Sequence, residues 1–135
     1  MGWREFDGIE RGYKEARKML RELLERDDEL FQRTQPGAIR YDQDKVQSSG
    51  GEDKLLAYVA QRQAEHLDER IRIARIHVEE WVDYRTRALN ELRRSRNPED
   101  RVYVLRMVDG LSVRKVARLV GYDKRHVYRI LKKMS

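Results

Sequence analysis

The stretch GLSVRKVARLVGYDKRHVYRILKKM, residues 110–134, places small and apolar residues at fixed offsets and ends in a run of positive charge. Ala117 is a small residue of the kind needed where one short helix crosses another, and Gly121, four residues later, tolerates a positive φ. Beyond this turn, Val127 and Ile130 fall on one side of a second helix. The spacing therefore predicts two helices joined by a tight turn, a helix-turn-helix.

Capping residues set the bounds of these helices. Ser112 and Asp123 stand where a side-chain oxygen caps a first turn, which predicts helices over 113–120 and from 124 to about 133. A third helix is predicted earlier, within 97–110, because asparagine, proline and two acidic residues open it and glycine closes it. Three short helices therefore end the chain.

The apolar residues of these helices are expected to form one small core. The last two helices supply Val116, Val120, Val127, Ile130 and Leu131. The preceding helix supplies a third wall from Val102, Leu105 and Met107 or Val108.

The side chains left facing outward are mainly basic, and they form the predicted DNA-binding set: Arg114, Lys115, Lys124, Arg125, His126, Tyr128, Arg129, Lys132 and Lys133. A recognition helix presents its N-terminal residues to base edges in the major groove and its flanks to phosphates. Arg125 and Arg129 are therefore the candidates for base contacts, since arginine can bridge guanine O6 and N7. Lys124, Lys132 and Lys133 suit phosphates. Arg114 and Lys115 lie near the start of the first helix of the helix-turn-helix, where that helix crosses the DNA backbone. For His126, two interpretations stay open. It can be read as a contact to a base or phosphate, or as an exposed residue without such a role.

The net charge of +6 is unevenly distributed along the 135 residues. Residues 1–97 carry equal numbers of basic and acidic side chains, whereas 98–135 carry ten basic and four acidic ones. Clustered lysine and arginine gain free energy from phosphate contacts and counterion release, so a polyanion partner is expected for this segment.

Upstream of the helix-turn-helix, apolar residues recur at helical spacing in two stretches. They predict a helix over about 9–31, a loop over 34–51 and an uninterrupted helix over about 52–94. The last would be about 60 Å long, so it should pair with the first helix as an antiparallel hairpin or self-associate as a coiled coil. We expect an all-α protein with a helical oligomerisation region, 1–96, and a DNA-binding domain, 97–135.

Three residues of the long loop, Ile39, Tyr41 and Val46, are too apolar for a plain linker, so part of the loop is expected to dock on helices. Gln63 and His66 interrupt the apolar stripe of the long helix. The register and the number of partner helices therefore stay open.

Nothing in the sequence indicates an enzyme, a cofactor or a metal site. There is no cysteine, no phosphate-binding loop and no dinucleotide fingerprint. Ser112 and Lys115 match an S-x-x-K pattern, but Ser112 is better explained as a helix cap. His66 and His77, eleven residues apart, would lie about 16 Å apart along a helix, too far to share a metal.

No apolar run is long enough to span a bilayer, and no secretory signal pattern opens the chain. Together with the absence of cysteine, this favours the cytoplasm and no membrane partner. The expected partners are double-stranded DNA and further copies of the chain, with a dimer favoured.

The C-terminal stretch EDRVYVLRMVDGLSVRKVARLVGYDKRHVYRILKKM, residues 99–134, resembles region 4 of sigma-70-type factors. More narrowly, GYDKRHVYRILKKM, the upstream PGAIRYDQDKVQSSGGEDK and the long charged helix between them resemble the ArpU/RinA-like regulators of phages and prophages of Gram-positive bacteria. This resemblance implies DNA binding and control of transcription, often of late phage genes, in the host cytoplasm and near host RNA polymerase. Nothing matches the region of a sigma factor that reads and melts the −10 element, so the chain should not initiate transcription alone.

Two other classes of protein remain as alternatives to a transcriptional regulator. A small terminase subunit, which recognises phage DNA for packaging, also joins a helix-turn-helix to a helical oligomerisation region. An adaptor protein whose basic end never contacts DNA is the other. A closed ring would favour packaging, whereas a dimer would favour regulation.

Overall fold

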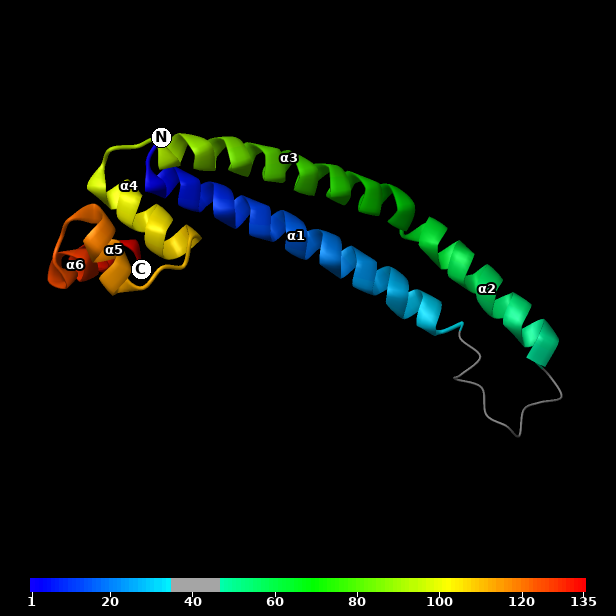
Figure 1. Ribbon diagram of the computed structural model, residues 1–135. Helices are drawn as coiled ribbons and strands as arrows, with labels where there is room; N and C mark the ends of the chain where they lie inside the picture. The colour runs from blue at the N-terminus through cyan, green and yellow to red at the C-terminus, as the bar shows by residue number, and fades with distance from the viewer. Residues whose placement is uncertain (35–46) are drawn as a thin grey trace. The chain divides into compact units, whose positions relative to one another are not determined.

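The computed structural model describes residues 1–34 and 47–135, and within 47–51 it describes the backbone alone (Figure 1). Every element in these ranges is a helix, which confirms the predicted all-α class. The elements are α1 (Trp3–Gln32), α2 (Gln47–Ala64), α3 (Leu67–Arg93), α4 (Pro98–Tyr103), a π-helical turn η3 (Val104–Val108), α5 (Val113–Val120) and α6 (Lys124–Met134). No helix in the described ranges has the length and apolarity needed to cross a membrane.

The chain divides into two compact units, but not where the sequence placed the boundary. One unit contains residues 1–13 and 81–135, and the other contains 14–80. The predicted division into 1–96 and 97–135 therefore differs from the observed one. The physical reason is that the start of α1 and the end of α3 supply part of the core on which α4 packs.

In the unit formed by residues 14–80, α1 and α3 run antiparallel (Figure 1). Leu67, Ile71 and Ala74 of α3 are buried against Leu23 and Leu30 of α1. The steps of four and three residues on α3, and the seven-residue step on α1, are the spacing that keeps one apolar seam facing a partner helix. Of the two predicted arrangements, the hairpin is thus formed within a single chain.

Polar contacts join α2 to α1 in the same unit. Asp27 accepts hydrogen bonds from the Tyr58 hydroxyl at 2.9 Å and from Arg62 Nε at 2.7 Å. Glu65, just beyond α2, accepts from Arg26 Nε at 3.0 Å and from Arg26 Nη2 at 2.8 Å. This bidentate arginine pair lowers the pKa of Glu65 to about 2.

The predicted uninterrupted helix over 52–94 is wrong, because the chain breaks between α2 and α3. His66 has a φ of 53°, and its N–H donates to the Gln63 carbonyl at 3.1 Å in a tight turn. A positive φ cannot continue an α-helix. The turn delivers Leu67 to the apolar seam with 0% exposure, and this burial offsets the strained backbone.

The loop predicted for 34–51 also differs from the structure, because α2 begins at Gln47. The expectation that Ile39, Tyr41 and Val46 dock on helices concerns positions outside the described residues.

Helix α1 begins six residues earlier than the predicted start near residue 9. Two glycines, residues of low helix propensity, lie in this part of α1 and have different surroundings. A Cβ at Gly8 would contact nothing within 4 Å, whereas a Cβ at Gly12 would lie 2.4 Å from Cη2 of Trp81 on α3. Gly12 therefore permits close approach of the two helices, and its lower helix propensity is compensated by packing.

The core of the unit formed by residues 1–13 and 81–135 joins the start of α1 to α4. Trp3 and Phe6 are buried, and both contact Tyr103 of α4, with ring centroids 5.7 Å and 5.9 Å away. The buried carboxylate of Asp100 accepts the Trp3 backbone N–H at 2.8 Å and the Ser95 hydroxyl at 2.6 Å. Asp100 thus satisfies an N–H of the first turn of α1 from a distant helix, which explains the early start of α1.

Candidate nucleic-acid interface

The turn between α5 and α6 has the geometry that the sequence predicted. Gly121 adopts a φ of 83°, and its N–H donates to the Ala117 carbonyl at 2.9 Å. The hydroxyl of Ser112 caps α5 by accepting the Lys115 N–H at 3.2 Å. The carboxylate of Asp123 caps α6. Both predicted caps and the glycine turn are therefore confirmed.

A small core holds α4, α5 and α6 together. Its fully buried members are Val102, Val116 and Val127, and Ala117 and Ile130 are 7% and 4% exposed. Leu105, Val120 and Leu131 are partly buried around them, as predicted. Two residues predicted for the third wall of this core lie outside it in the structure. Met107 is 57% exposed, and Val108 packs against the cluster that contains Trp3 and Phe6.

The helix predicted within 97–110 consists of an α-helical turn followed by a π-helical one. Asn97 caps α4 by accepting the Glu99 N–H at 2.9 Å. In η3, the Asp109 N–H donates to the Val104 carbonyl at 2.9 Å, five residues back. The carboxylate of Asp109 also accepts two hydrogen bonds from Arg93 of α3, at 2.8 Å and 3.1 Å, and this pair lowers the pKa of Asp109.

Helix α6 exposes a basic face opposite its buried face. At about 100° per residue, the inward direction of Val127 and Ile130 places Arg125, Arg129 and Lys132 on the opposite side of the helix. All three basic side chains are exposed. Tyr128, 59% exposed, lies beside them, and Lys124 is exposed at the first position of the helix. This set of residues, which we call the α6 basic face (Lys124, Arg125, Tyr128, Arg129, Lys132), is free to contact a ligand.

His126 and Lys133 lie at the edges of α6 and already have partners. The imidazole of His126 lies edge-on to the Tyr122 ring, with centroids 4.4 Å apart. Lys133 Nζ lies 3.1 Å from Glu99 Oε1 and links α6 to α4. The Lys133 ammonium, and secondarily the Trp3 indole N–H, lower the pKa of Glu99. A phosphate that engaged Lys133 would therefore compete with this ion pair.

Helix α5 adds positive charge in its first turn, where Arg114 and Lys115 are exposed. Arg118 is exposed as well and shares their side of the helix, although it was not among the predicted DNA-binding residues. Its four-residue spacing from Arg114 is the signal that could have identified it.

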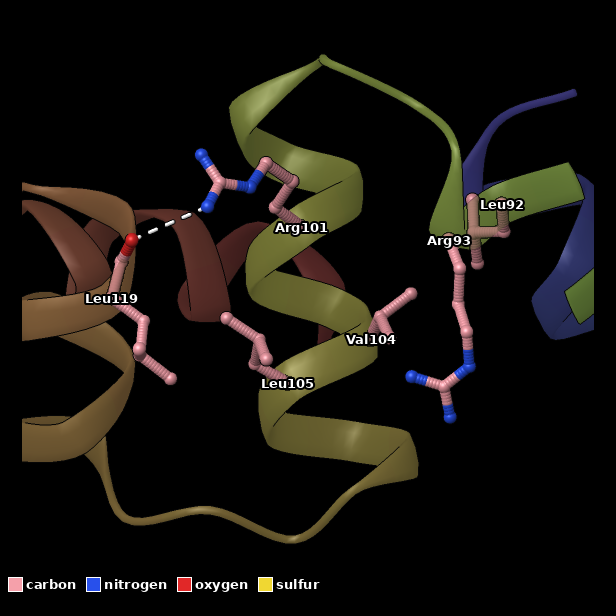
Figure 2. A pocket seen from close by; sticks show the side chains of 6 residues that line it. All are labelled: Leu92, Arg93, Arg101, Val104, Leu105 and Leu119. Carbon is pink, nitrogen blue, oxygen red and sulfur yellow. Dashed lines mark hydrogen bonds between the residues drawn. The ribbon is translucent and has the colours of Figure 1, made fainter. Parts of the chain in front are cut away.

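An apolar pocket of about 370 Å³ opens between α3, α4, η3 and α5, and its lining includes none of the predicted DNA-binding residues (Figure 2). Its lining is Leu92, Arg93, Arg101, Val104, Leu105 and Leu119. Figure 2 shows Arg101 reaching across to the Leu119 carbonyl, which accepts its Nη2 at 3.2 Å. This hydrogen bond joins α4 to α5 and helps to fix the helix-turn-helix.

These features together define a helix-turn-helix DNA-binding domain: two capped helices, a glycine turn, a shared core and an exposed basic second helix. Residues 95–135 match the family model of a homeodomain-like domain. No curated protein and no solved structure matches the chain. The family match covers α4 to α6 and supports double-stranded DNA as the ligand.

Proposed function

We propose that the protein is a sequence-specific regulator of transcription that binds double-stranded DNA through α6. The observation that carries this proposal is the α6 basic face, which is exposed while the opposite side of the same helix is buried in a small apolar core. A helix of about 10 Å diameter enters the major groove, where each base pair presents a distinct pattern of hydrogen-bonding groups.

The residues of the interface have different proposed roles. Arg125 and Arg129 contact base edges, because they lie in the first half of α6 and on its outward side. Lys124 and Lys132 contact phosphates at the two ends of the face. Arg114, with its neighbour Lys115, contacts the DNA backbone from the first turn of α5. His126, Tyr128 and Lys133 flank these contacts.

The biological role rests on the resemblance to ArpU/RinA-like regulators and to sigma region 4. On this basis the chain acts on phage or prophage genes in the cytoplasm of a bacterial host. It activates late genes by binding near a promoter, in contact with host RNA polymerase. The chain also acts as a homodimer, so that two recognition helices bind half-sites separated by roughly 34–36 Å or a multiple of this distance.

Two experiments test this proposal. The first recovers the fragments that purified protein binds from fragmented bacterial and phage DNA, and one shared site upstream of promoters is expected. The second adds the protein to host polymerase on such a promoter, and a several-fold higher transcript yield is expected. Recovery of random fragments, or an unchanged transcript yield, would contradict the proposal.

A DNA-packaging subunit is the second candidate, favoured by the exposed apolar side chains on the helices outside the helix-turn-helix. Such a subunit forms a closed ring, which needs a head-to-tail interface between copies. Sedimentation of the purified protein separates the candidates. A ring of about eight or more chains would favour packaging, whereas a two-fold dimer favours regulation.

A further inference from the structure

The C-terminal end of α6 is attached to two other helices through one carboxylate. Lys133 Nζ lies 3.1 Å from Oε1 of Glu99 on α4. The other oxygen of this carboxylate, Oε2, accepts the indole N–H of Trp3 on α1 at 3.4 Å. Glu99 therefore joins the end of the recognition helix to the first turn of α1.

Apolar packing joins the same three helices. Met134, the last residue of α6, packs against the core that contains Val102 and Val127. It also packs against the cluster that contains Trp3 and Phe6. Among the described residues, Met134 alone packs against both of these cores. We call Trp3, Glu99, Lys133 and Met134 together the α6 anchor.

The α6 anchor and the glycine turn hold opposite ends of α6. At the beginning of the helix, Gly121 makes the turn, and Asp123 caps the first turn by accepting the His126 N–H at 2.8 Å. At the other end the anchor holds Lys133, about 14 Å further along the axis. Because two points define an axis, these two attachments set the direction in which α6 presents its outward side chains.

The ion pair in the anchor contributes orientation more than stability. The side chains of Lys133 and Glu99 are 60% and 34% exposed, and exposed pairs add little to the free energy of unfolding. Met134 supplies apolar burial instead. The pair then selects one position of the helix end, because hydrogen-bond lengths vary by only about 0.5 Å.

The same contact makes Lys133 a poor ligand for a DNA phosphate. Its ammonium is engaged by Glu99, and the negative charge of Glu99 would repel a phosphate that approached the pair. The ammonium of the preceding residue, Lys132, is exposed and has no partner among the described contacts. Two adjacent lysines of α6 therefore differ in what they can bind.

We propose that the α6 anchor positions the recognition helix, and that Lys133 and Glu99 are positioning residues for sequence recognition rather than DNA contacts. Arg129 lies one turn before Lys133, so a shift of the helix end displaces its guanidinium from a base edge, where two hydrogen bonds must form together. The first turn of α1, outside the family match of 95–135, thus belongs to the recognition unit. This role rests on the proposed function, whereas the anchor itself does not require DNA.

The first test measures the anchor in the full chain without DNA, by amide hydrogen exchange followed by NMR. Lys133→Met removes the ammonium, and Glu99→Gln removes the charge but keeps an acceptor for the Trp3 indole. In both variants the amides of the last turn of α6 are expected to exchange several-fold faster than in the unaltered protein. Lys132→Met is the matched control and should leave this exchange unchanged. Unchanged exchange in Lys133→Met and Glu99→Gln would overturn the proposal.

The second test measures the Kd for the site that recovered fragments share and for random duplex of the same length, and their ratio is the site preference. Lys133→Met and Glu99→Gln are each expected to lower the site preference by roughly 5-fold or more, as the loss of one base contact does. The double variant should lose no more than either single variant, because the two side chains act as one pair.

Conservative variants complete the second test. Lys133→Arg can still pair with Glu99 and should keep the site preference. Lys132→Met should weaken binding to both duplexes alike, because it removes a phosphate contact and leaves the anchor intact.

A phosphate contact by Lys133 predicts a different pattern. Glu99→Gln would then strengthen binding to both duplexes by freeing the ammonium, whereas Lys133→Met would weaken both, and neither would change the site preference. Lys133→Met would also reduce the slope of log K against log salt concentration by about 0.9, as the loss of one phosphate contact does. This pattern would overturn the proposal.

The two tests separate this inference from the proposed function. Faster exchange together with a lower site preference in Lys133→Met and Glu99→Gln supports the inference. Faster exchange with an unchanged site preference would overturn the positioning role. No site preference of the unaltered protein would instead overturn the proposed function, and faster exchange would then still support the anchor.

Discussion

The close approach of α1 to α3 at Gly12 gives a prediction that opposes ordinary helix propensity. Replacing glycine by alanine inside a helix usually stabilises it by about 0.5–1 kcal/mol. At Gly12, however, the new Cβ would lie 2.4–2.8 Å from three atoms of the Trp81 ring, where contacts of 3.4–4 Å are ordinary. The rigid, half-buried ring must move by about 1 Å, and overpacking of this kind costs about 1–3 kcal/mol. We therefore expect Gly12→Ala to lower the free energy of unfolding by about 1–2 kcal/mol.

Gly8 is the matched control, because it lies one turn earlier on α1 and a Cβ there meets nothing within 4 Å. Gly8→Ala should raise the free energy of unfolding by about 0.5–1 kcal/mol. Urea unfolding followed by circular dichroism at 222 nm measures both changes. In a Trp81→Leu background, Gly12→Ala should lose its penalty because the ring is gone. Stabilisation by Gly12→Ala in the unaltered chain would refute the proposed contact.

Substitutions at three further positions test the fold. Asp100→Ala leaves the buried Trp3 N–H without its acceptor, so thermal unfolding should show a loss of about 1–3 kcal/mol; an unchanged Tm would contradict this cap. Gly121→Ala places a Cβ at a φ of 83°, which should cost about 1–2 kcal/mol, and Gly121→Asn should cost less, as urea titration will show. The pKa of Glu65 is lowered to about 2 from 4.5, so its pair with Arg26 stabilises the fold above about pH 4.5 and this contribution disappears as the pH falls toward 2. The stability difference between Glu65→Gln and the unaltered protein should vanish over that window, and a constant difference down to pH 2 would argue against the pair.

The helix-turn-helix could be predicted from the sequence because its determinants are local. Ser112, Ala117, Gly121 and Asp123 act on neighbours within a few residues, so the caps and the turn follow from spacing alone. The buried and exposed sides of α6 follow equally from helical periodicity. The predicted caps, turn and core agree with the structure for this reason.

The early start of α1 could not be predicted, since its cause is a contact between distant positions. The Trp3 N–H and its acceptor Asp100 are 97 residues apart. Periodicity along either helix gives no information about this pair. The same holds for Gly12, which looks like a weak position in sequence but adjoins Trp81 in the structure.

The break at His66 was missed for a different reason. Helix-breaking turns are recognised by glycine and proline, and neither occurs between residues 52 and 94. Histidine is one of the residues that tolerate a positive φ when tertiary burial compensates, and here Leu67 supplies that burial. The apolar residues of α2 lie both on the side that faces α1 and on the opposite side. Their spacing therefore could not show that α2 ends and α3 begins at this turn.

The roles within the candidate interface depend on which side chains are free. The pairing of Lys133 with Glu99 follows from the packing of α6 on α4, and no sequence spacing indicates it. Arg125, Arg129 and Lys132 have no such restraint among the described contacts, so they carry the main weight of the proposed recognition.

Sequence-specific recognition by α6 is the central claim, and one binding measurement tests it directly. The Kd for a selected site and for random duplex of the same length is measured at one salt concentration, for the unaltered protein, Arg125→Ala and Lys132→Ala. Arg125→Ala should lose about 1–3 kcal/mol on the selected site and little on random duplex, whereas Lys132→Ala should weaken both alike. Equal losses on both duplexes for Arg125→Ala, or no preference of the unaltered protein for any site, would contradict the claim.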